Sequence, residues 1–292
     1  MATSTSDPGR PRTAHNGSVE ICTEAFGDPA DPIVLLIMGA TASMLWWPEA
    51  FCLALAGTGL AVIRYDNRDT GRSTTVPAGA PTYTMEDMAD DAIAVLDDYG
   101  VHSAHVVGMS LGGMIAQLVA LKVPERVLSL TAISTSAFDE DDPDLPPMSP
   151  AFLAHFERLE ALDWTDRDAV VAFQVESARL SANAGARFDE DEARRLAERE
   201  FDRARNPRSA MNHGRLSVGE ARSGRVSEIA MPALVIHGER DPILSLAGAR
   251  KLTARLGDAR LRILEGGHEL NPDDWPQIIA DIKALTERTI LR

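Results

Sequence analysis

Short runs of mostly hydrophobic residues recur along the chain and are separated by longer segments with helical spacing. The run at residues 33–38 is hydrophobic throughout. The runs at 61–65, 105–107, 127–133 and 233–237 are hydrophobic except at Arg64, His105, Ser129, Thr131 and His237. Runs of this kind are typical of strands that are buried on both faces of a parallel sheet. The segments expected to be helical lie at residues 49–56, 85–99 and 114–121. This alternation predicts an α/β fold built on a mostly parallel, doubly wound sheet.

The pattern changes between residues 138 and 228. An acidic, proline-rich stretch at residues 139–147 cannot form a core strand. Helical spacing then returns, with helix starts expected near Thr165, Glu190 and Asn206. We therefore expect a core domain and a mainly helical cap inserted after the sixth strand; a larger core with extra surface helices is the alternative. The expected division is a disordered N-terminus at 1–13, a core at 14–137 and 229–292, and a cap at 138–228.

Residues 108–112 read Gly-Met-Ser-Leu-Gly and stand between a predicted strand and a predicted helix. A direct passage from strand to helix needs a sharp turn, which strains the serine backbone and crowds the residues two positions away on either side. Gly108 and Gly112 are small enough for such a turn. The pattern makes Ser110 a candidate nucleophile, although an ordinary strand-to-helix turn can have the same sequence.

Two further polar side chains follow the ends of predicted strands. Asp241 comes after the strand at 233–237, and His268 comes after a strand at 260–264. In open parallel sheets, ligands bind outside the carboxyl ends of the strands. We therefore expect Ser110, Asp241 and His268 to meet at one site.

A serine, an aspartate and a histidine in this order and context resemble the α/β-hydrolase superfamily. Residues 26–32, 38–39 and 65–73 also resemble the bacterial esterases related to aclacinomycin methylesterase. Met38 stands where many members of the superfamily carry a histidine before the glycine, and the methylesterase group departs at the same place. The resemblance implies an α/β-hydrolase fold.

The three side chains suit nucleophilic catalysis. A serine hydroxyl is a weak nucleophile at neutral pH and needs a base within hydrogen-bond reach. His268 is the candidate base, and Asp241 would hold its imidazole in one tautomer. Glu239 is a rival for the acid, but the superfamily pattern favours Asp241. The resemblance also implies that the backbone N–H groups of Ala40 and Leu111 form an oxyanion hole.

Composition limits the partners and the location. The formal net charge of −15 would repel nucleic acids and anionic membranes. No stretch is long enough to span a bilayer and residues 1–12 lack the apolar core of a signal peptide, so we expect a cytoplasmic protein. The two cysteines, Cys22 and Cys52, are expected to be buried free thiols. The sequence does not determine the oligomeric state, and a homo-oligomer is one of the alternatives.

The cluster of Asp66, Arg68 and Asp69 has side chains that could bind a metal ion or a phosphate. No second cluster with ligand spacing accompanies it, so we expect a salt-bridged loop. The mechanism outlined above needs neither a metal nor a cofactor.

The sequence therefore predicts a serine hydrolase that cleaves a small-molecule carboxylic ester through an acyl-enzyme at Ser110. The methylesterase resemblance points to the methyl ester of a bulky hydrophobic or polyketide-like acid. Perhydrolysis without a cofactor and C–C bond hydrolysis are alternatives on the same three residues, and a ligand-binding protein with slow turnover is a third. The side chains expected to line the substrate pocket, unless they are ordinary packing, are Trp46, Phe138, Phe152 and His213.

Overall fold

A single mixed sheet forms the centre of the protein. The computed structural model describes residues 10–182, 188–219 and 225–290. Within these residues the sheet has eight strands in the order β1-β2-β4-β3-β5-β6-β7-β8. The pairs β1–β2 and β2–β4 are antiparallel and the others are parallel. The strands are β1 (Arg12–Asn16), β2 (Val19–Phe26), β3 (Ile33–Ile37), β4 (Ala61–Tyr65), β5 (Ala104–Met109), β6 (Val127–Ile133), β7 (Ala233–Gly238) and β8 (Ala259–Leu264).

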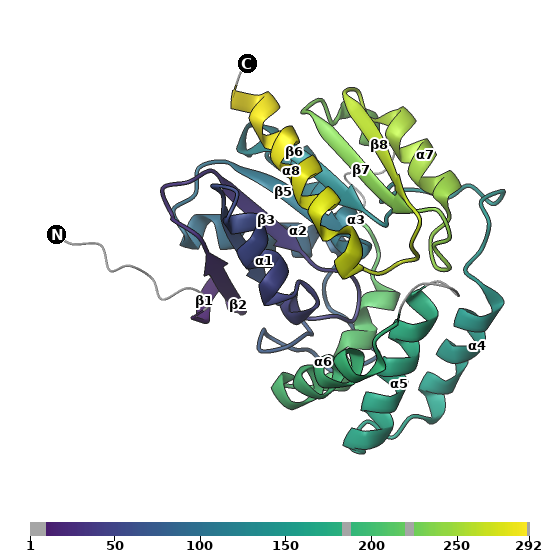
Figure 1. Ribbon diagram of the computed structural model, residues 1–292. Coiled ribbons are helices and arrows are strands. Elements are labelled where there is room, and N and C mark those ends of the chain that lie inside the picture. The colour runs from purple at the N-terminus through teal and green to yellow at the C-terminus, as the bar shows by residue number, and fades with distance from the viewer. Residues whose placement is uncertain (1–9, 183–187, 220–224, 291–292) are drawn as a thin grey trace.

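Helices cover both faces of the sheet (Figure 1). On one face lie α1 (Glu49–Ala56) and α8 (Trp275–Ile290), and on the other lie α2 (Met85–Asp98), α3 (Leu111–Lys122) and α7 (Leu246–Arg255). Successive side chains of a strand point to opposite faces, so Leu35 of β3 packs with α2 and α3 while Leu36 packs with α1 and α8. Both leucines are fully buried. A strand covered on both faces is buried at nearly every position, which accounts for the mostly hydrophobic runs.

The cap is helical, as expected. It contains α4 (Pro150–Glu157), α5 (Arg167–Ser181), α6 (Glu190–Arg203) and the 3-10 helix η4 (Pro207–Arg215). The side chains of Asp166 and Asp189 accept hydrogen bonds from the first turns of α5 and α6, which explains where these helices begin. In Figure 1 these helices lie together beyond one end of the strands.

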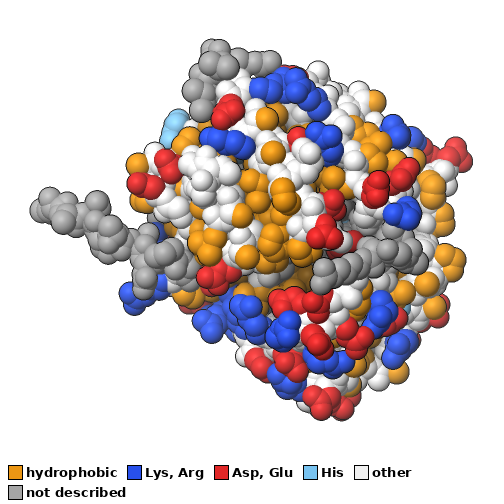
Figure 2. All heavy atoms as spheres, viewed as in Figure 1, with side chains coloured by type: hydrophobic (Ala, Val, Ile, Leu, Met, Phe, Trp, Pro, Cys, Tyr) orange, Lys and Arg blue, Asp and Glu red, His pale blue; other side chains and the backbone are white. Residues whose placement is uncertain are grey.

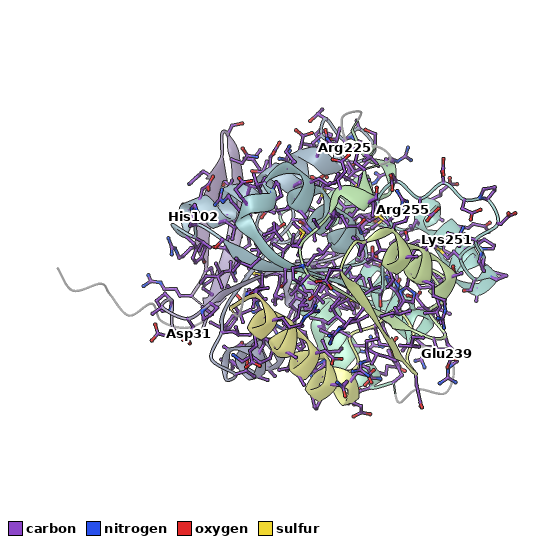
Figure 3. All side chains as sticks on the ribbon, turned by 90° about the horizontal axis from the view of Figure 1, so that it is seen from above. Asp31, His102, Arg225, Glu239, Lys251 and Arg255 are labelled. Carbon is purple, nitrogen blue, oxygen red and sulfur yellow. The ribbon has the colours of Figure 1, made fainter. Side chains whose placement is uncertain are left out.

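Charged side chains attach the linker to the core and cover the outside of the cap. The acidic linker after β6 is held by α7, where Lys251 pairs with Asp142 and Arg255 pairs with Asp139; both basic residues are labelled in Figure 3. The outer surface of the cap, at the bottom of Figure 2, carries interspersed basic and acidic side chains. Many of them form exposed ion pairs, which contribute little stability individually.

Two further expectations can be compared with the structure. The expected disorder at residues 1–13 is wrong for the last two residues, because β1 begins at Arg12. The sequence of β1 has no apolar run because β1 is an edge strand with one buried side chain, Ala14. Residues 1–9 lie outside the described residues. Cys22 and Cys52 are buried free thiols, as expected, and burial raises their pKa values to about 11 and about 12. In the part of the chain that the structure describes, no helix is both long and apolar enough to cross a membrane.

Candidate active site

Ser110 occupies a strained turn between β5 and α3. Its φ of 54° and ψ of −123° place it in a region that L-amino acids rarely adopt. The turn is held by the backbone: Ser110 N donates to Ile133 O at 2.9 Å, and Ser110 O accepts from Gly113 N at 2.8 Å and from Thr135 Oγ1 at 2.8 Å. The Ser110 side chain is half-buried. The neighbouring strand thus fixes the serine where a substrate can reach it.

The two glycines of the turn have no room for a side chain. A Cβ on Gly108 would lie 2.1 Å from Gly112 O, and a Cβ on Gly112 would lie 2.1 Å from Ile37 O. Both contacts are with backbone atoms, which cannot move aside without unpacking β3 or α3. This crowding is what the sequence pattern predicts for a serine presented on a sharp turn.

Asp241 and His268 are joined by a hydrogen bond. His268 Nδ1 lies 2.7 Å from Asp241 Oδ2, and Asp241 Oδ1 accepts from the backbone N–H groups of Ile243 at 2.8 Å and Leu244 at 2.9 Å. The Asp241 side chain is completely buried and His268 is 8% exposed. A buried carboxylate facing Nδ1 favours the tautomer with the proton on that atom, which leaves Nε2 as a proton acceptor.

Close backbone packing brings the His268 loop to the end of β7. A Cβ on Gly238 would lie 2.1 Å from Gly267 O, so only glycine permits this approach. The backbone N–H of His268 also donates to Ser181 O at the end of α5, at 2.9 Å. The cap therefore contacts the loop that carries the histidine. Among the described residues, His268 Nε2 and Ser110 Oγ form no hydrogen bond with each other, as is common in active sites without substrate.

The rival acid lies away from this pair, and two other buried histidines have partners of their own. Glu239 is exposed and points outward at the rim of the molecule in Figure 3. His105 is paired with Ser129 Oγ at 2.8 Å inside the sheet. His237 Nε2 lies 2.9 Å from Leu244 O and 3.4 Å from Asp241 Oδ2, so it is a second neighbour of the oxygen that binds His268. Burial lowers the pKa of His237.

Residues 38–43 connect β3 to the 3-10 helix η1 (Met44–Trp46), and we call them the β3–η1 segment. The segment runs beside the serine, because a Cβ on Gly39 would lie 3.0 Å from Ser110 Cβ. Ala40 follows and is exposed. Within the described residues, no hydrogen bond takes up the backbone N–H of Ala40 or of Leu111. Two free donors thus flank the serine.

The four candidate pocket residues belong to separate packing groups. Trp46 is half-buried beside α1, Phe138 is buried on the opposite face of the sheet, and Phe152 packs on Phe156 at 4.9 Å within the cap. His213 is 5% exposed, and both of its ring nitrogens bind backbone groups, as described below. A small cavity between the cap and the β3–η1 segment is lined by Thr41, among other residues, but not by Ser110. Contact of the four with substrate stays a prediction.

The loop after β4 is salt-bridged, as expected. Arg68 pairs with Asp91 at 2.5 Å and Asp66 pairs with Arg203 of α6 at 2.8 Å. Asp69 accepts hydrogen bonds from Tyr83 and Asn212. Each acid in the loop therefore has a protein partner, and the described residues contain no cluster of three or more side chains suited to a metal ion.

The structure also reveals a functional candidate that the sequence analysis missed. Glu200 of α6 is 4% exposed and binds Ser43 in the β3–η1 segment. Its position carried a signal, because Glu200 follows the buried Ala197 by three residues and therefore lies on the buried stripe of an otherwise strongly charged helix.

Comparison with known proteins places this arrangement in a family. Residues 32–274 match the family described as the alpha/beta hydrolase fold, and the chain belongs to it. The chain is 37% identical over 275 residues to rhodomycin D methylesterase DnrP of Streptomyces peucetius, which covers 89% of this chain and 92% of that protein. It is 38% identical over 270 residues to rhodomycin D methylesterase DauP of Streptomyces sp. strain C5, covering 86% and 90% of the two chains. The expected resemblance to methylesterase-type enzymes is thereby confirmed.

Solved structures share the fold at lower identity. The esterase from Exiguobacterium antarcticum superposes with a TM-score of 0.78 at 19% identity, covering 95% of this chain and all of that one. At such low identity the likeness establishes the fold alone.

Proposed function

We propose that the protein is a carboxylic ester hydrolase that uses Ser110 as nucleophile, His268 as base and Asp241 as the acid that orients the histidine. The observation that carries the proposal is the hydrogen bond of 2.7 Å between His268 Nδ1 and the buried Asp241, on the same strand edge as the strained Ser110. The similarity to two rhodomycin D methylesterases supports an ester as substrate.

The reaction would proceed in two halves. Ser110 Oγ attacks the carbonyl carbon while its proton passes to His268 Nε2, and the C=O bond becomes a single-bonded oxyanion. The N–H groups of Ala40 and Leu111 would donate to that oxygen, and such a donor is worth about 3 kcal/mol in the transition state. The intermediate then expels the alcohol, which takes the proton from His268. A water molecule, deprotonated by His268, releases the acid from Ser110 in the same way.

The cap is expected to select the acyl part of the substrate, because it contacts the loops on both sides of the serine. The relatives named above act on rhodomycin D, so we propose a methyl ester of a bulky hydrophobic acid as the substrate class. Apolar pockets distinguish substrates mainly by shape and size. The hydrolysis of such an ester should therefore be faster than that of a short acetyl ester.

Labelling tests the nucleophile. A fluorophosphonate probe should modify one serine per chain, identified as Ser110 by peptide mapping, because Ser110 combines a strained, half-buried turn with the proposed base His268. Ser110→Ala should abolish both labelling and hydrolysis. Labelling that persists in this variant would refute the assignment.

Substrate preference is tested separately. We expect kcat/KM for methyl esters to rise as the acyl group becomes larger and more hydrophobic, because the larger group buries more apolar surface against the cap. A series with a constant methanol leaving group isolates the acyl effect. A steady fall with acyl size would overturn the proposed substrate class while leaving the serine mechanism intact.

A further inference from the structure

The backbone of the β3–η1 segment is held mainly by side chains from other parts of the fold. Met38 O accepts from Asn67 Nδ2 at 2.8 Å. Thr41 N donates to His213 Nδ1 at 3.0 Å, and Ser43 N donates to Glu200 Oε1 at 3.2 Å. Ala40 N–H, which lies between these anchored groups, is the one we expect to face the substrate.

Thr41 is strained. Its φ of 64° lies in the left-handed region, which a β-branched residue adopts only at a cost of about 1–2 kcal/mol. The bond to His213 opposes this strain, because it keeps the Thr41 N–H pointing into the cap. The conformation of the peptide that follows Ala40 therefore depends on a side chain that is 172 residues away in the sequence.

His213 is suited to this task. Its Nε2 lies 2.8 Å from Arg68 O, which can only accept a hydrogen bond, so the proton resides on Nε2 and Nδ1 is left as the acceptor for Thr41. Burial lowers the pKa of His213, which keeps the imidazole neutral and Nδ1 free of a proton. The histidine thus bridges the β3–η1 segment and the loop after β4.

Glu200 anchors the other end of the segment. Besides the bond to Ser43 N, its Oε2 lies 2.5 Å from Ser43 Oγ. Burying a carboxylate is unfavourable, and both of the hydrogen bonds that compensate here come from one residue of the segment. Next to it, Met44 N donates to Asp66 Oδ1 at 3.0 Å, and Asp66 is paired with Arg203, also of α6.

We propose that Glu200 and His213, both in the cap, are positioning residues that hold the β3–η1 segment so that Ala40 N–H donates to the oxyanion. The inference rests on the proposed ester hydrolysis. It makes the cap part of the catalytic apparatus, because without these two anchors the donor beside Ser110 would lose its fixed direction.

A thionoester comparison tests the inference. Wild type is assayed with a methyl ester and with the same ester carrying sulfur in place of the carbonyl oxygen, which is a weaker hydrogen-bond acceptor. A directed donor favours the oxygen ester. Glu200→Ala and His213→Ala should each lower kcat for the oxygen ester by about tenfold or more, with KM changed by less than about twofold, and should lower the oxygen-to-sulfur preference.

Matched variants separate positioning from general damage. Glu200→Gln keeps an acceptor for Ser43 N–H and should restore most of the rate lost in Glu200→Ala. Arg205→Ala removes another contact between cap and core, the ion pair with Glu20 at 2.9 Å, without touching the segment, and should behave like wild type. Ser43→Ala removes the bond to Glu200 Oε2 and the cap that Ser43 Oγ provides for Leu45 N–H, but it keeps the bond from Ser43 N to Glu200. It replaces Glu200→Ala if that variant does not fold.

The outcomes distinguish the two proposals. An oxygen-to-sulfur preference in Glu200→Ala and His213→Ala equal to that of wild type would overturn the positioning role, even if kcat fell. An Arg205→Ala variant that lost the preference to the same extent would also overturn it. A wild-type protein that neither hydrolyses methyl esters nor labels at Ser110 would overturn the proposed function and this inference together.

Discussion

Asp241 divides its two carboxylate oxygens between two tasks. Oδ1 is fixed by two backbone N–H groups of the turn that follows β7, and Oδ2 binds His268, with His237 Nε2 3.4 Å away. The turn thereby sets the direction of the Asp241 side chain independently of its contact with His268. Because each oxygen has a separate partner, replacing one of them with nitrogen is expected to impair the function of the side chain.

Asp241→Asn should preserve the fold and lower kcat by about 10³- to 10⁴-fold. The turn needs an acceptor, so the amide oxygen should replace Oδ1 and the NH₂ group should face His268. That donor would force the proton from Nδ1 to Nε2, where it prevents His268 from accepting the proton of Ser110. Steady-state kinetics with a methyl ester, together with a melting curve, measure both effects.

Glu239→Gln is the matched control for this prediction. Glu239 lies two positions earlier in the chain but is exposed at the rim of the molecule. Its substitution should leave kcat within about twofold of wild type. A larger loss in Glu239→Gln than in Asp241→Asn would show that the acid is misassigned.

The candidate residues that the sequence indicated are marked by short motifs, whereas those it missed are defined by contacts between distant parts of the chain. Ser110 and its two glycines form one turn, and Asp241 and His268 directly follow strands, so short motifs were sufficient to identify them. Glu200 and Ser43 are 157 residues apart, and no pattern within either segment indicates the partner. Only the folded cap brings them together.

Helices α1 and α8 pack against each other through aromatic rings. Phe51 of α1 stacks on Trp47 with a centroid distance of 5.6 Å and meets Trp275 of α8 edge-on at 5.7 Å. Phe51 is fully buried. The first helix after the β3–η1 segment is therefore fastened to the last helix of the chain.

Phe51→Ala should destabilise the protein by about 3–5 kcal/mol, because it leaves a cavity between two helices and the sheet. Leu53→Ala on the same helix should change the free energy of unfolding by less than about 0.5 kcal/mol, since Leu53 is 48% exposed. Denaturant unfolding of both variants measures the difference. Equal losses would contradict the packing described for α1.

Strands covered on both faces were predictable, whereas the edge strand β1 was not. The runs at 61–65 and 127–133 match β4 and β6 because a doubly covered strand is mostly apolar, and their polar side chains, such as Arg64 and Ser129, are buried with hydrogen-bond partners. In β1 only Ala14 is fully buried, so hydrogen bonds to β2 define the strand and its sequence does not reveal it. The helix starts of the cap were visible because their capping residues act locally.

Glu200, at the junction of cap and core, makes the stability of the whole protein depend on pH. Burial raises the pKa of Glu200 from 4.5 to about 7, and the nearby Asp66 adds to the increase, while the bonds from Ser43 and the charge of Arg203 oppose it. In the unfolded chain the carboxyl loses its proton near pH 4.5, but in the folded protein it keeps the proton until about pH 7. Between these values the unfolded state binds fewer protons, so the Glu200 contribution to stability falls as pH rises.

Glu200→Gln cannot ionise and should remove this loss. The stability of the variant relative to wild type should therefore increase between about pH 4.5 and 7 and then level off, with a total change on the order of 3 kcal/mol. Asp66 and Arg203 remain in both proteins, so the difference isolates Glu200. Urea unfolding at a series of pH values measures it. A difference that stays constant with pH, or that falls as pH rises, would contradict a buried, proton-holding Glu200.

The point of insertion of the cap has a consequence for how such enzymes diversify. Because β6 and β7 are parallel neighbours, the chain must in any case travel from the end of one to the start of the other. It leaves β6 at the same edge of the sheet where Ser110, Asp241 and His268 are presented. Any lengthening of this obligatory crossover therefore emerges beside the proposed catalytic residues and not at a distant surface. A change in this one connection can thus alter what covers the proposed site without any change in the strands that carry Ser110, Asp241 and His268.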